Sequence, residues 1–361
     1  MTARGVSLDA LTMDFELSED QLALRQAARG LLDDLSSPLR VRGVVDRGGG
    51  FDEELWKAMA VQGWMGVEVP EAQGGLGLGT VEAAVLLEEV GRHLAPAPFL
   101  SSLLAVGALA RAAASGVAWA DRWVESLVSG EAIGAVAWEP RAPVLFAPSA
   151  DVIVACVTED DGSPVLIGAE VADRRAGRQP AMDLTRELGW VELEGLPAVR
   201  LGGPEAVATM MDRGAVGHGA EMLGGAGRAL ELAVEHAKDR VQFGRPIGSF
   251  QAVKHRCADM LVDVEGMRSS VYHGAWCISA GDPDAAVAAS TAKVWCSDAG
   301  PRVMASCLQV HGGIGFTWEH DLHLFLKRAQ LDQVSFGDAA YHRERLALLL
   351  RFRVESGGSV V

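Results

Sequence analysis

The sequence predicts a mainly α-helical protein with a β domain in its middle. Apolar residues recur at helical spacing through residues 13–132 and again from residue 204 onward. Between these regions, residues 133–203 alternate or run apolar in short segments, as β-strands do. We therefore expect an N-terminal all-α domain at 13–132, a middle β domain at 133–203 and a C-terminal helical bundle at 204–361.

The N-terminal domain is expected to open with a helix capped by Ser18, because Glu19 and Asp20 follow in a first turn that favours acids. A second helix is expected to begin at Phe51-Asp52. Glycines then interrupt the pattern through residues 63–77, as in a loop. Three further helices are expected at 81–92, 98–114 and 119–128.

Short strands are expected in the middle domain at 135–139 and 151–158, with further candidates at 164–167 and 190–193, before residues 197–203 lead out. The C-terminal domain carries an apolar stripe with steps of three and four residues, which predicts packing in a helical bundle. Asp282-Pro283-Asp284 ends that helix, and later helices are expected at 285–308, 321–331 and 339–352. A four-helix bundle that self-associates is the expected result. The stripe consists of Val253, Cys257, Met260, Val264, Met267, Val271, Ala275 and Ile278.

Composition excludes several classes of function. The 361 residues carry a formal net charge of -16, so the chain is a poor candidate for binding nucleic acid or an anionic membrane. Residues 1–11 lack the apolar core of a signal peptide, and no apolar run is long enough for a membrane span. We expect a cytoplasmic protein without a metal site, whose cysteines are buried thiols in a reducing compartment. These are Cys156, Cys257, Cys277, Cys296 and Cys307.

A tight connection at residues 240–251 is the first candidate binding site. Gly244 and Gly248 permit sharp turns, and Pro246 prevents a helix from continuing. The turn should gather Arg240, Phe243, Arg245 and Gln251 at one end of a helical hairpin. Guanidinium, aromatic and amide groups together suit a ligand with a pyrophosphate and a flat ring. The alternative is a plain loop with solvated arginines.

A second candidate site is the stretch Gln309-Val310-His311-Gly312-Gly313-Ile314-Gly315-Phe316. Paired glycines at a helix end let a phosphate or a ring approach the backbone N–H groups. The alternative is an ordinary glycine cap at the end of a helix.

Together the two stretches resemble the acyl-CoA dehydrogenase family. In that family an arginine–x–x–Phe-Gly hairpin and a Gln–x–x–Gly-Gly–x–Gly segment hold FAD, and the second segment reaches a neighbouring subunit's flavin. The resemblance implies the family's fold: an N-terminal helical domain, a β domain and a C-terminal four-helix bundle. It also implies FAD-binding roles for Arg240, Gln242, Phe243, Gln251, Gln309, Gly312 and Gly313.

The middle domain departs from the family pattern. A Glu-Pro–x–Ala-Gly-Ser-Asp segment and a Trp-Ile-Thr strand are usual there. Here Glu139-Pro140 is followed by Arg141-Ala142-Pro143-Val144, and no Trp-Ile-Thr occurs. The resemblance therefore implies a shortened β domain with altered contacts to the flavin ring.

The catalytic glutamate that the family uses as a base is missing from both of its usual positions. The Tyr-Glu-Gly-like segment corresponds to Ser335-Phe336-Gly337-Asp338-Ala339, so Gly337 occupies the glutamate's position. The other position falls near Ser279 and Ala280. Asp338 is a candidate substitute base, and its alternative role is the N-cap of the last helix.

Two interpretations follow from the resemblance. In the preferred one, the chain is the short, base-lacking subunit of a heteromeric (α2β2) acyl-CoA dehydrogenase, like actinobacterial enzymes that shorten steroid side chains. FAD, an acyl-CoA substrate and an electron-transfer flavoprotein as acceptor are then expected. In the other, the chain is a self-sufficient homo-oligomer with a displaced base. A flavin monooxygenase on the same fold is a third possibility, which nothing in the sequence favours.

Overall fold

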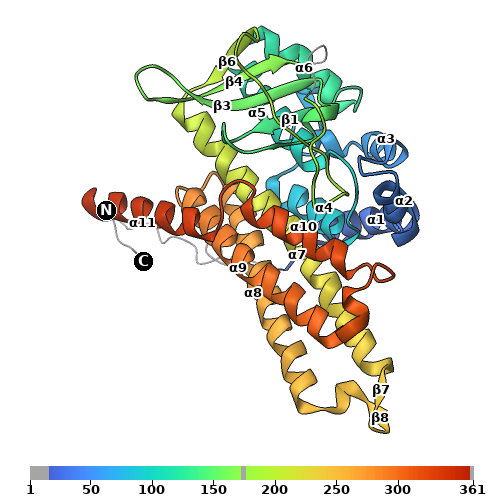
Figure 1. The fold of residues 1–361 in the computed structure, drawn as a ribbon. Coiled ribbons are helices and arrows are strands. Elements are labelled where there is room, and N and C mark those ends of the chain that lie inside the picture. The colour runs from blue at the N-terminus through green and yellow to red at the C-terminus, as the bar shows by residue number, and fades with distance from the viewer. Residues whose placement is uncertain (1–15, 172–175, 358–361) are drawn as a thin grey trace.

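The computed structural model describes residues 16–171 and 176–357, so the predicted domain start at residue 13 lies outside the described residues. Helices dominate, a small sheet lies at one end, and a long helical arm extends at the other (Figure 1). Ser18 forms the predicted cap, because its side chain accepts a hydrogen bond from the Gln21 N–H. The N-terminal helices are α1 (Glu19–Leu35), α2 (Pro38–Asp46), α3 (Glu53–Val61), α4 (Thr80–Arg92), α5 (Phe99–Ala114) and α6 (Ala118–Val128).

Helix α2 was not predicted from the sequence. It is only nine residues long and begins with Pro38 in the first turn, where proline fits a helix. Only Val41 and Val44 are fully buried, so it carries too few apolar residues to show a helical period. The loop at 63–77 folds into two short 3-10 turns, η2 (Trp64–Gly66) and η3 (Glu71–Gln73).

Four strands form the main sheet of the middle region, in the order β1-β3-β4-β6, with β1 and β3 parallel and the other pairs antiparallel. The strands are β1 (Gly134–Ala137), β3 (Val152–Thr158), β4 (Pro164–Glu170) and β6 (Ala198–Gly202). The expected strand at 190–193 is wrong: the pairing residues are β5 (Leu188–Gly189), which meet β2 (Val144–Leu145). From the sequence, residues 197–203 were expected only to lead out of the middle domain. They contain β6, because its backbone pairs with the open edge of β4.

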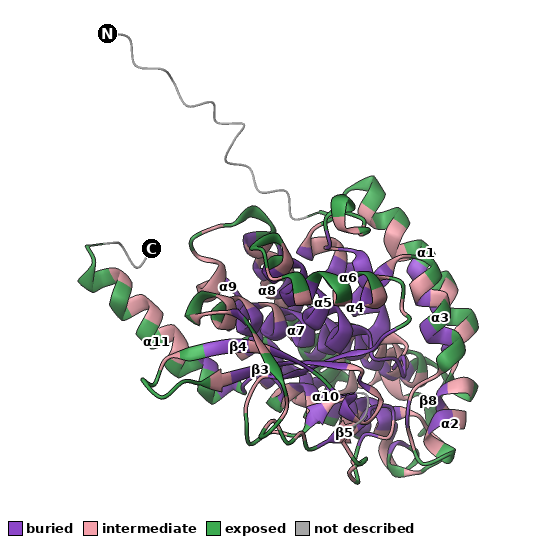
Figure 2. Cartoon of the chain, turned by 90° about the horizontal axis from the view of Figure 1, so that it is seen from above, coloured by how far each residue is buried: buried purple, intermediate pink, exposed green. Residues whose placement is uncertain are grey.

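The C-terminal region is a bundle built around α7 (Pro204–Asp239), α8 (Gln251–Ala280), α9 (Ala285–His311) and α10 (Leu322–Val334). Helices α7 and α8 run antiparallel and project together as the arm in Figure 1. The stripe is confirmed in its central part, where Met260, Val264, Met267, Val271 and Ala275 are buried. A last helix, α11 (Ala339–Glu355), packs along α9, and its outer end projects from the body with mostly exposed residues (Figure 2).

The five cysteines are all free, and only Cys257 is less than fully buried. Within the described ranges, no helix is both long and apolar enough to cross a bilayer.

Candidate functional site

The predicted binding hairpin forms the tip of the arm, where α7 ends and α8 begins. A two-stranded turn of β7 (Val241–Gln242) and β8 (Arg245–Pro246) joins the helices, followed by the 3-10 turn η6 (Ile247–Ser249). Phe243 is 92% exposed and has a φ of 53°, a left-handed conformation that non-glycine residues rarely adopt. The Arg245 guanidinium lies 4.2 Å from the centre of the Phe250 ring. The tip of the arm therefore presents an aromatic ring to solvent.

The same hairpin carries exposed polar residues. Arg240 is the exposed C-cap of α7, and it forms no ion pair with a carboxylate anywhere in residues 16–171 or 176–357. Gln251 is exposed in the first turn of α8. The side chain of Gln242 is also exposed, although its amide donates a hydrogen bond to the Val241 carbonyl at 2.7 Å. The hairpin therefore offers a free cation and an amide beside an aromatic face.

The glycine segment lies beside the same end of the bundle. Helix α9 ends at His311, and Gly312, with φ 63° and ψ −139°, begins the turn η7 (Gly312–Phe316). Gln309 is exposed in the last turn of α9, and a Cβ added at Gly312 or Gly313 would meet no atom within 4 Å. This backbone is therefore accessible to a ligand or a neighbouring chain.

Stacked histidine rings connect the two predicted segments. His236, one turn before Arg240, stacks on His311 with ring centres 4.5 Å apart, and His311 meets His320 edge to face at 4.8 Å. Burial and the neighbouring imidazole of His311 lower the pKa of His236. The same two causes lower the pKa of His320. The tertiary structure thus brings the two segments together through the stacked rings of His236 and His311.

The position of the family's glutamate is sterically closed. Gly337 has a φ of 86°, and a Cβ added there would overlap the ring of Tyr341. Asp338 is exposed, and its carboxylate accepts a hydrogen bond from the Tyr341 N–H at 2.9 Å, so it caps α11. At the second position, the Ser279 hydroxyl accepts a hydrogen bond from the Thr80 N–H at 2.7 Å. A side chain at position 337 would therefore need a local rearrangement, and the second position holds a serine in place of an acid.

Phe336 fills the space next to Gly337. Its ring is 3% exposed, stacks on Trp138 with centres 5.6 Å apart and lies 5.5 Å from the His218 ring. The cavity that remains has a volume of about 20 Å³, and none of its lining residues is a carboxylate. A cavity of this size has room for roughly one water molecule and not for an acyl thioester.

Beneath Phe336 lies a polar cluster that sequence reasoning missed. His218 and Glu221 of α7 and Asp332 of α10 are buried and place potential ligand atoms within 4.8 Å of one another. His218 Nδ1 lies 3.1 Å from Asp332 Oδ1. His218 Nε2, Glu221 Oε1 and Asp332 Oδ2 have no hydrogen-bond partner among the described residues. One imidazole and two carboxylates are a donor set that could hold a divalent metal.

Cations already balance that cluster. Arg186 donates to Glu221 at 2.6 Å, and Lys293 donates to the Asp332 carbonyl at 2.7 Å. Arg328 completes the set by donating to Asp183 at 2.8 Å. The two carboxylates of the cluster, together with the neighbouring Asp183, thus lie among three cations, so electrostatics disfavours a further divalent ion in this buried place. Asp183 and Arg328 are 145 residues apart in the chain, and no local pattern could have predicted their pairing.

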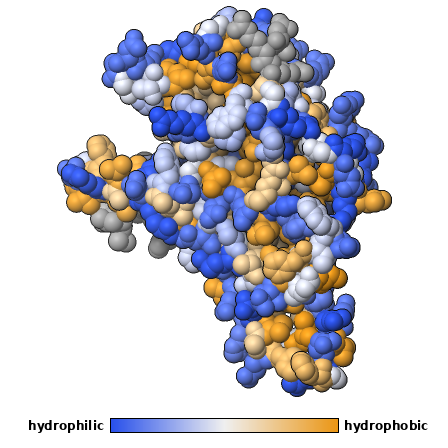
Figure 3. Space-filling view, in the orientation of Figure 1, coloured by the Kyte–Doolittle hydropathy of each residue, from blue (hydrophilic) through white to orange (hydrophobic). Residues whose placement is uncertain are grey.

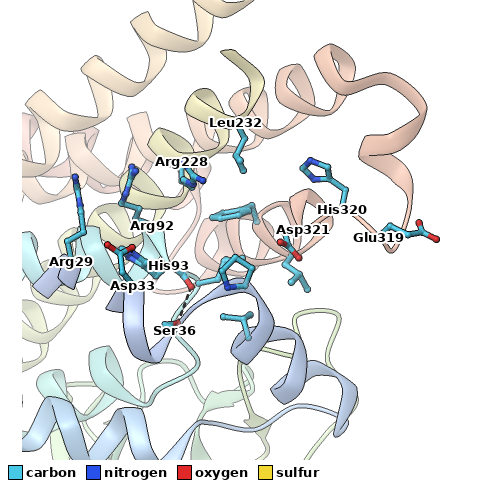
Figure 4. Close-up of a pocket in the computed structure, with 15 residues that line it drawn as sticks. Arg29, Asp33, Ser36, Arg92, His93, Arg228, Leu232, Glu319, His320 and Asp321 are labelled. Atoms are coloured by element: carbon cyan, nitrogen blue, oxygen red, sulfur yellow. Dashed lines mark hydrogen bonds and ion pairs between the residues drawn. The ribbon is translucent and has the colours of Figure 1, made fainter. Parts of the chain in front are cut away.

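A cavity of about 420 Å³ lies between the N-terminal helices and the bundle (Figure 4). Several of its lining side chains have partners: Arg92 pairs with Glu231 at 2.6 Å, and the His93 ring contacts Asp33 at 3.0 Å. His320 also lines this cavity and contacts His311, so the cavity borders the glycine segment.

Comparison with known proteins identifies two matching family models. One, described as acyl-CoA dehydrogenase, N-terminal domain, matches residues 18–131. The other, described as acyl-CoA dehydrogenase, C-terminal domain, matches residues 202–349. Among curated proteins, acyl-CoA dehydrogenase IpdE2 of Mycolicibacterium smegmatis is 37% identical over 314 residues, which cover 87% of this chain and 93% of that protein.

Solved structures share the fold over almost the whole chain. A chain of the Tcur3481-Tcur3483 steroid ACAD variant is similar with a TM-score of 0.87 and 29% identity, covering 93% of this chain and 99% of that one. A chain of the ChsE4-ChsE5 complex from Mycobacterium tuberculosis has a TM-score of 0.84 and 29% identity, covering 94% and 99%. The FAD complex of PigA has a TM-score of 0.82 and 25% identity, covering 94% and 100%.

Proposed function

The chain belongs to the acyl-CoA dehydrogenase family, and from that premise we propose that it is the base-lacking subunit of a heteromeric, FAD-dependent acyl-CoA dehydrogenase. The enzyme would introduce a double bond between the α and β carbons of an acyl-CoA thioester. This reaction needs a carboxylate that removes the α proton and a flavin that accepts hydride from the β carbon.

One observation carries the proposal: the site for the base and the acyl group is closed in this chain. Gly337 has no room for a side chain, and Phe336, packed on Trp138, occupies the adjoining space. Even if a carboxylate stood at position 337, the adjoining space would be too small for the acyl chain that it would have to deprotonate. The proposal therefore assigns the base and the acyl pocket to a partner subunit.

The residues of this chain fit the dinucleotide end of FAD. An arginine without a carboxylate partner suits a pyrophosphate, and an exposed aromatic suits a flat purine. Gly312 and Gly313 leave their backbone open, so N–H groups can approach a phosphate or ring. We assign the pyrophosphate to Arg240, the aromatic contact to Phe243, and polar contacts to Gln242, Gln251 and Gln309.

The surface of the chain also supports a partner. Apolar side chains are exposed at the tip of the arm, on η7 and along α11, and in Figure 3 apolar residues gather on the arm and at the outer end of α11. Scattered exposure is ordinary, but apolar residues grouped on projecting elements indicate contact with another chain. The similar ChsE4-ChsE5 structure is itself a complex of two proteins. The exposed residues include Val241, Phe243, Ile314, Phe316, Trp318, Leu348, Phe352 and Val354.

We extend the proposal to a steroid-type acyl-CoA as substrate and to electron-transfer flavoprotein as acceptor. Similarity to a chain of a steroid ACAD supports the steroid-type substrate. Electron-transfer flavoprotein as the acceptor is implied by membership of the family alone.

The test is co-expression of this chain with each acyl-CoA dehydrogenase chain of its organism that retains the glutamate. We expect a stable complex with one FAD per pair of unlike subunits, and dehydrogenation of acyl-CoA only by the complex. An FAD-loaded, active oligomer of this chain alone would refute the subunit assignment.

A substitution tests the FAD contact. In the complex, Arg240→Gln should weaken FAD retention by about tenfold, because a charge-assisted hydrogen bond contributes about 1.5–3 kcal/mol. Arg122→Gln is the matched control, since Arg122 is an exposed arginine on α6, paired with Glu170. Equal FAD retention in both variants would contradict the assignment of Arg240.

A self-sufficient homo-oligomer with a displaced base is the second candidate, and one observation favours it. His218 lines the small cavity at Phe336, is held by Asp332 and has an unpartnered Nε2. An imidazole supported by a carboxylate can act as a general base. If the chain alone is active and His218→Gln abolishes that activity, this candidate replaces the first.

A further inference from the structure

A separate pocket of about 290 Å³ opens on the N-terminal side of the molecule. It lies between the loop that follows α3, helix α5, helix α7 and the end of α8. Its polar lining includes Arg111, Arg213 and Glu68, and its apolar lining includes Leu78 and Ile278. The volume lies at the lower end of the range that small-molecule sites occupy, about 300–1,000 Å³.

Two guanidinium groups converge on one side of this pocket. A Cβ built on Gly107 of α5 would lie 3.6 Å from Arg111 Nη1 and 3.9 Å from Arg213 Nε, so both groups flank the same point. Arg213 forms an ion pair with Glu68. No carboxylate in residues 16–171 or 176–357 forms an ion pair or hydrogen bond with Arg111. Two positive charges thus face one negative charge.

The surplus charge has no counter-charge among the residues that the structure describes. Desolvation by neighbouring groups, together with repulsion from Arg213, lowers the pKa of Arg111 to about 10. The whole chain has a net charge of -16, and yet this pocket collects an unbalanced cation. An anion between the guanidiniums would neutralise it and accept their hydrogen bonds.

The pocket shares no lining residue with the space at Phe336. A second small cavity, about 10 Å³, lies between α4, α5 and α7, and shares Glu68, Thr80 and Arg213 with the pocket. The same small cavity shares Leu100 and Leu104 with the 20 Å³ space at Phe336. The pocket and the space at Phe336 are therefore separate cavities.

We propose that this pocket binds a small amphipathic monoanion, with its carboxylate on Arg111 and Arg213 and its apolar body against Leu78, Ala110 and Ile278. A monoanion is preferred to a phosphate ester because the surplus is a single positive charge. Recognition by paired arginines supplies the specificity, and the apolar wall supplies the remaining binding energy. This site does not depend on the subunit role of the chain.

Calorimetric titration of the full-length chain, or of its purified complex, tests the proposal with octanoate, octanol and octyl phosphate as probes. We expect saturable binding of octanoate with one site per copy of this chain. Octanol has the same apolar body without the charge and should bind at least about tenfold more weakly. Octyl phosphate binding more tightly than octanoate would overturn the assignment of a monoanion.

A variant keeps the test specific to the pocket. Arg111 is exposed and has no carboxylate partner among the described residues, so Arg111→Gln should fold normally. It should weaken octanoate binding by at least about tenfold. Arg122→Gln, a nearby exposed arginine on α6, should leave octanoate binding unchanged. Unchanged binding in Arg111→Gln, or no binding of octanoate at millimolar concentration, would refute the site.

Discussion

Gly214, in the N-terminal third of α7, and Phe336, in the turn before α11, should be strongly coupled in energy. A Cβ added at Gly214 would overlap the Phe336 ring, which is 3% exposed and stacked on Trp138. Overpacking of a core costs about 1–3 kcal/mol, and this overlap belongs at the upper end. Because alanine gains about 1 kcal/mol over glycine within a helix, Gly214→Ala should destabilise the protein by a net of about 2 kcal/mol.

The effect should change sign when the ring is removed. Phe336→Ala alone should cost about 3–5 kcal/mol, since it deletes a fully packed aromatic side chain. In that background, the methyl group that Gly214→Ala adds has space, so only the helix preference remains, and the same substitution should stabilise by about 1 kcal/mol. The coupling free energy is then about 3 kcal/mol, at the upper end of measured values for contacting residues.

Hydrogen exchange of the α7 amides measures this coupling directly, because it reports the local opening free energy and does not require the whole chain to unfold in one step. The wild-type chain, both single variants and the double variant form the cycle. Additive changes in opening free energy, within about 0.5 kcal/mol, would show that Phe336 does not occupy the space beside Gly214. The proposed closure of the base site would then lose its support.

Two further predictions concern buried polar groups. Burial lowers the pKa of His342 from 6.5 to about 4, so the unfolded chain binds this proton more readily than the folded one. The stabilisation is therefore complete above pH 6.5 and is lost as the pH falls toward 4, by on the order of 3 kcal/mol. Urea unfolding at several pH values measures this loss, and the free energy of unfolding of His342→Gln should depend less on pH than that of the wild type. Arg186→Met should destabilise by about 3–5 kcal/mol, because it leaves the Glu221 carboxylate buried without its cation. The double variant Arg186→Met, Glu221→Leu should recover most of that loss in thermal unfolding, and a double variant as unstable as the single one would contradict this reasoning.

The local elements could be predicted from the sequence, because their causes are local. Ser18 caps α1, the apolar stripe buries Met260 to Ala275, and Asp282-Pro283-Asp284 separates α8 from α9. The sequence also shows that the position of the family's glutamate holds Gly337, because the residue type alone tells whether a carboxylate is present.

Pairings between distant segments were decided only by the tertiary structure. The strand at 190–193 was wrong because strand residues are selected by the backbone they pair with, and β2 pairs with Leu188–Gly189. His236 and His311 meet because α7 and α9 end side by side. Asp183 meets Arg328, and Arg111 lies beside Arg213, for the same reason. The pattern of buried positions along a helix depends on residues that are close together in the sequence. The partner of a buried charge depends instead on how whole helices and strands pack against one another.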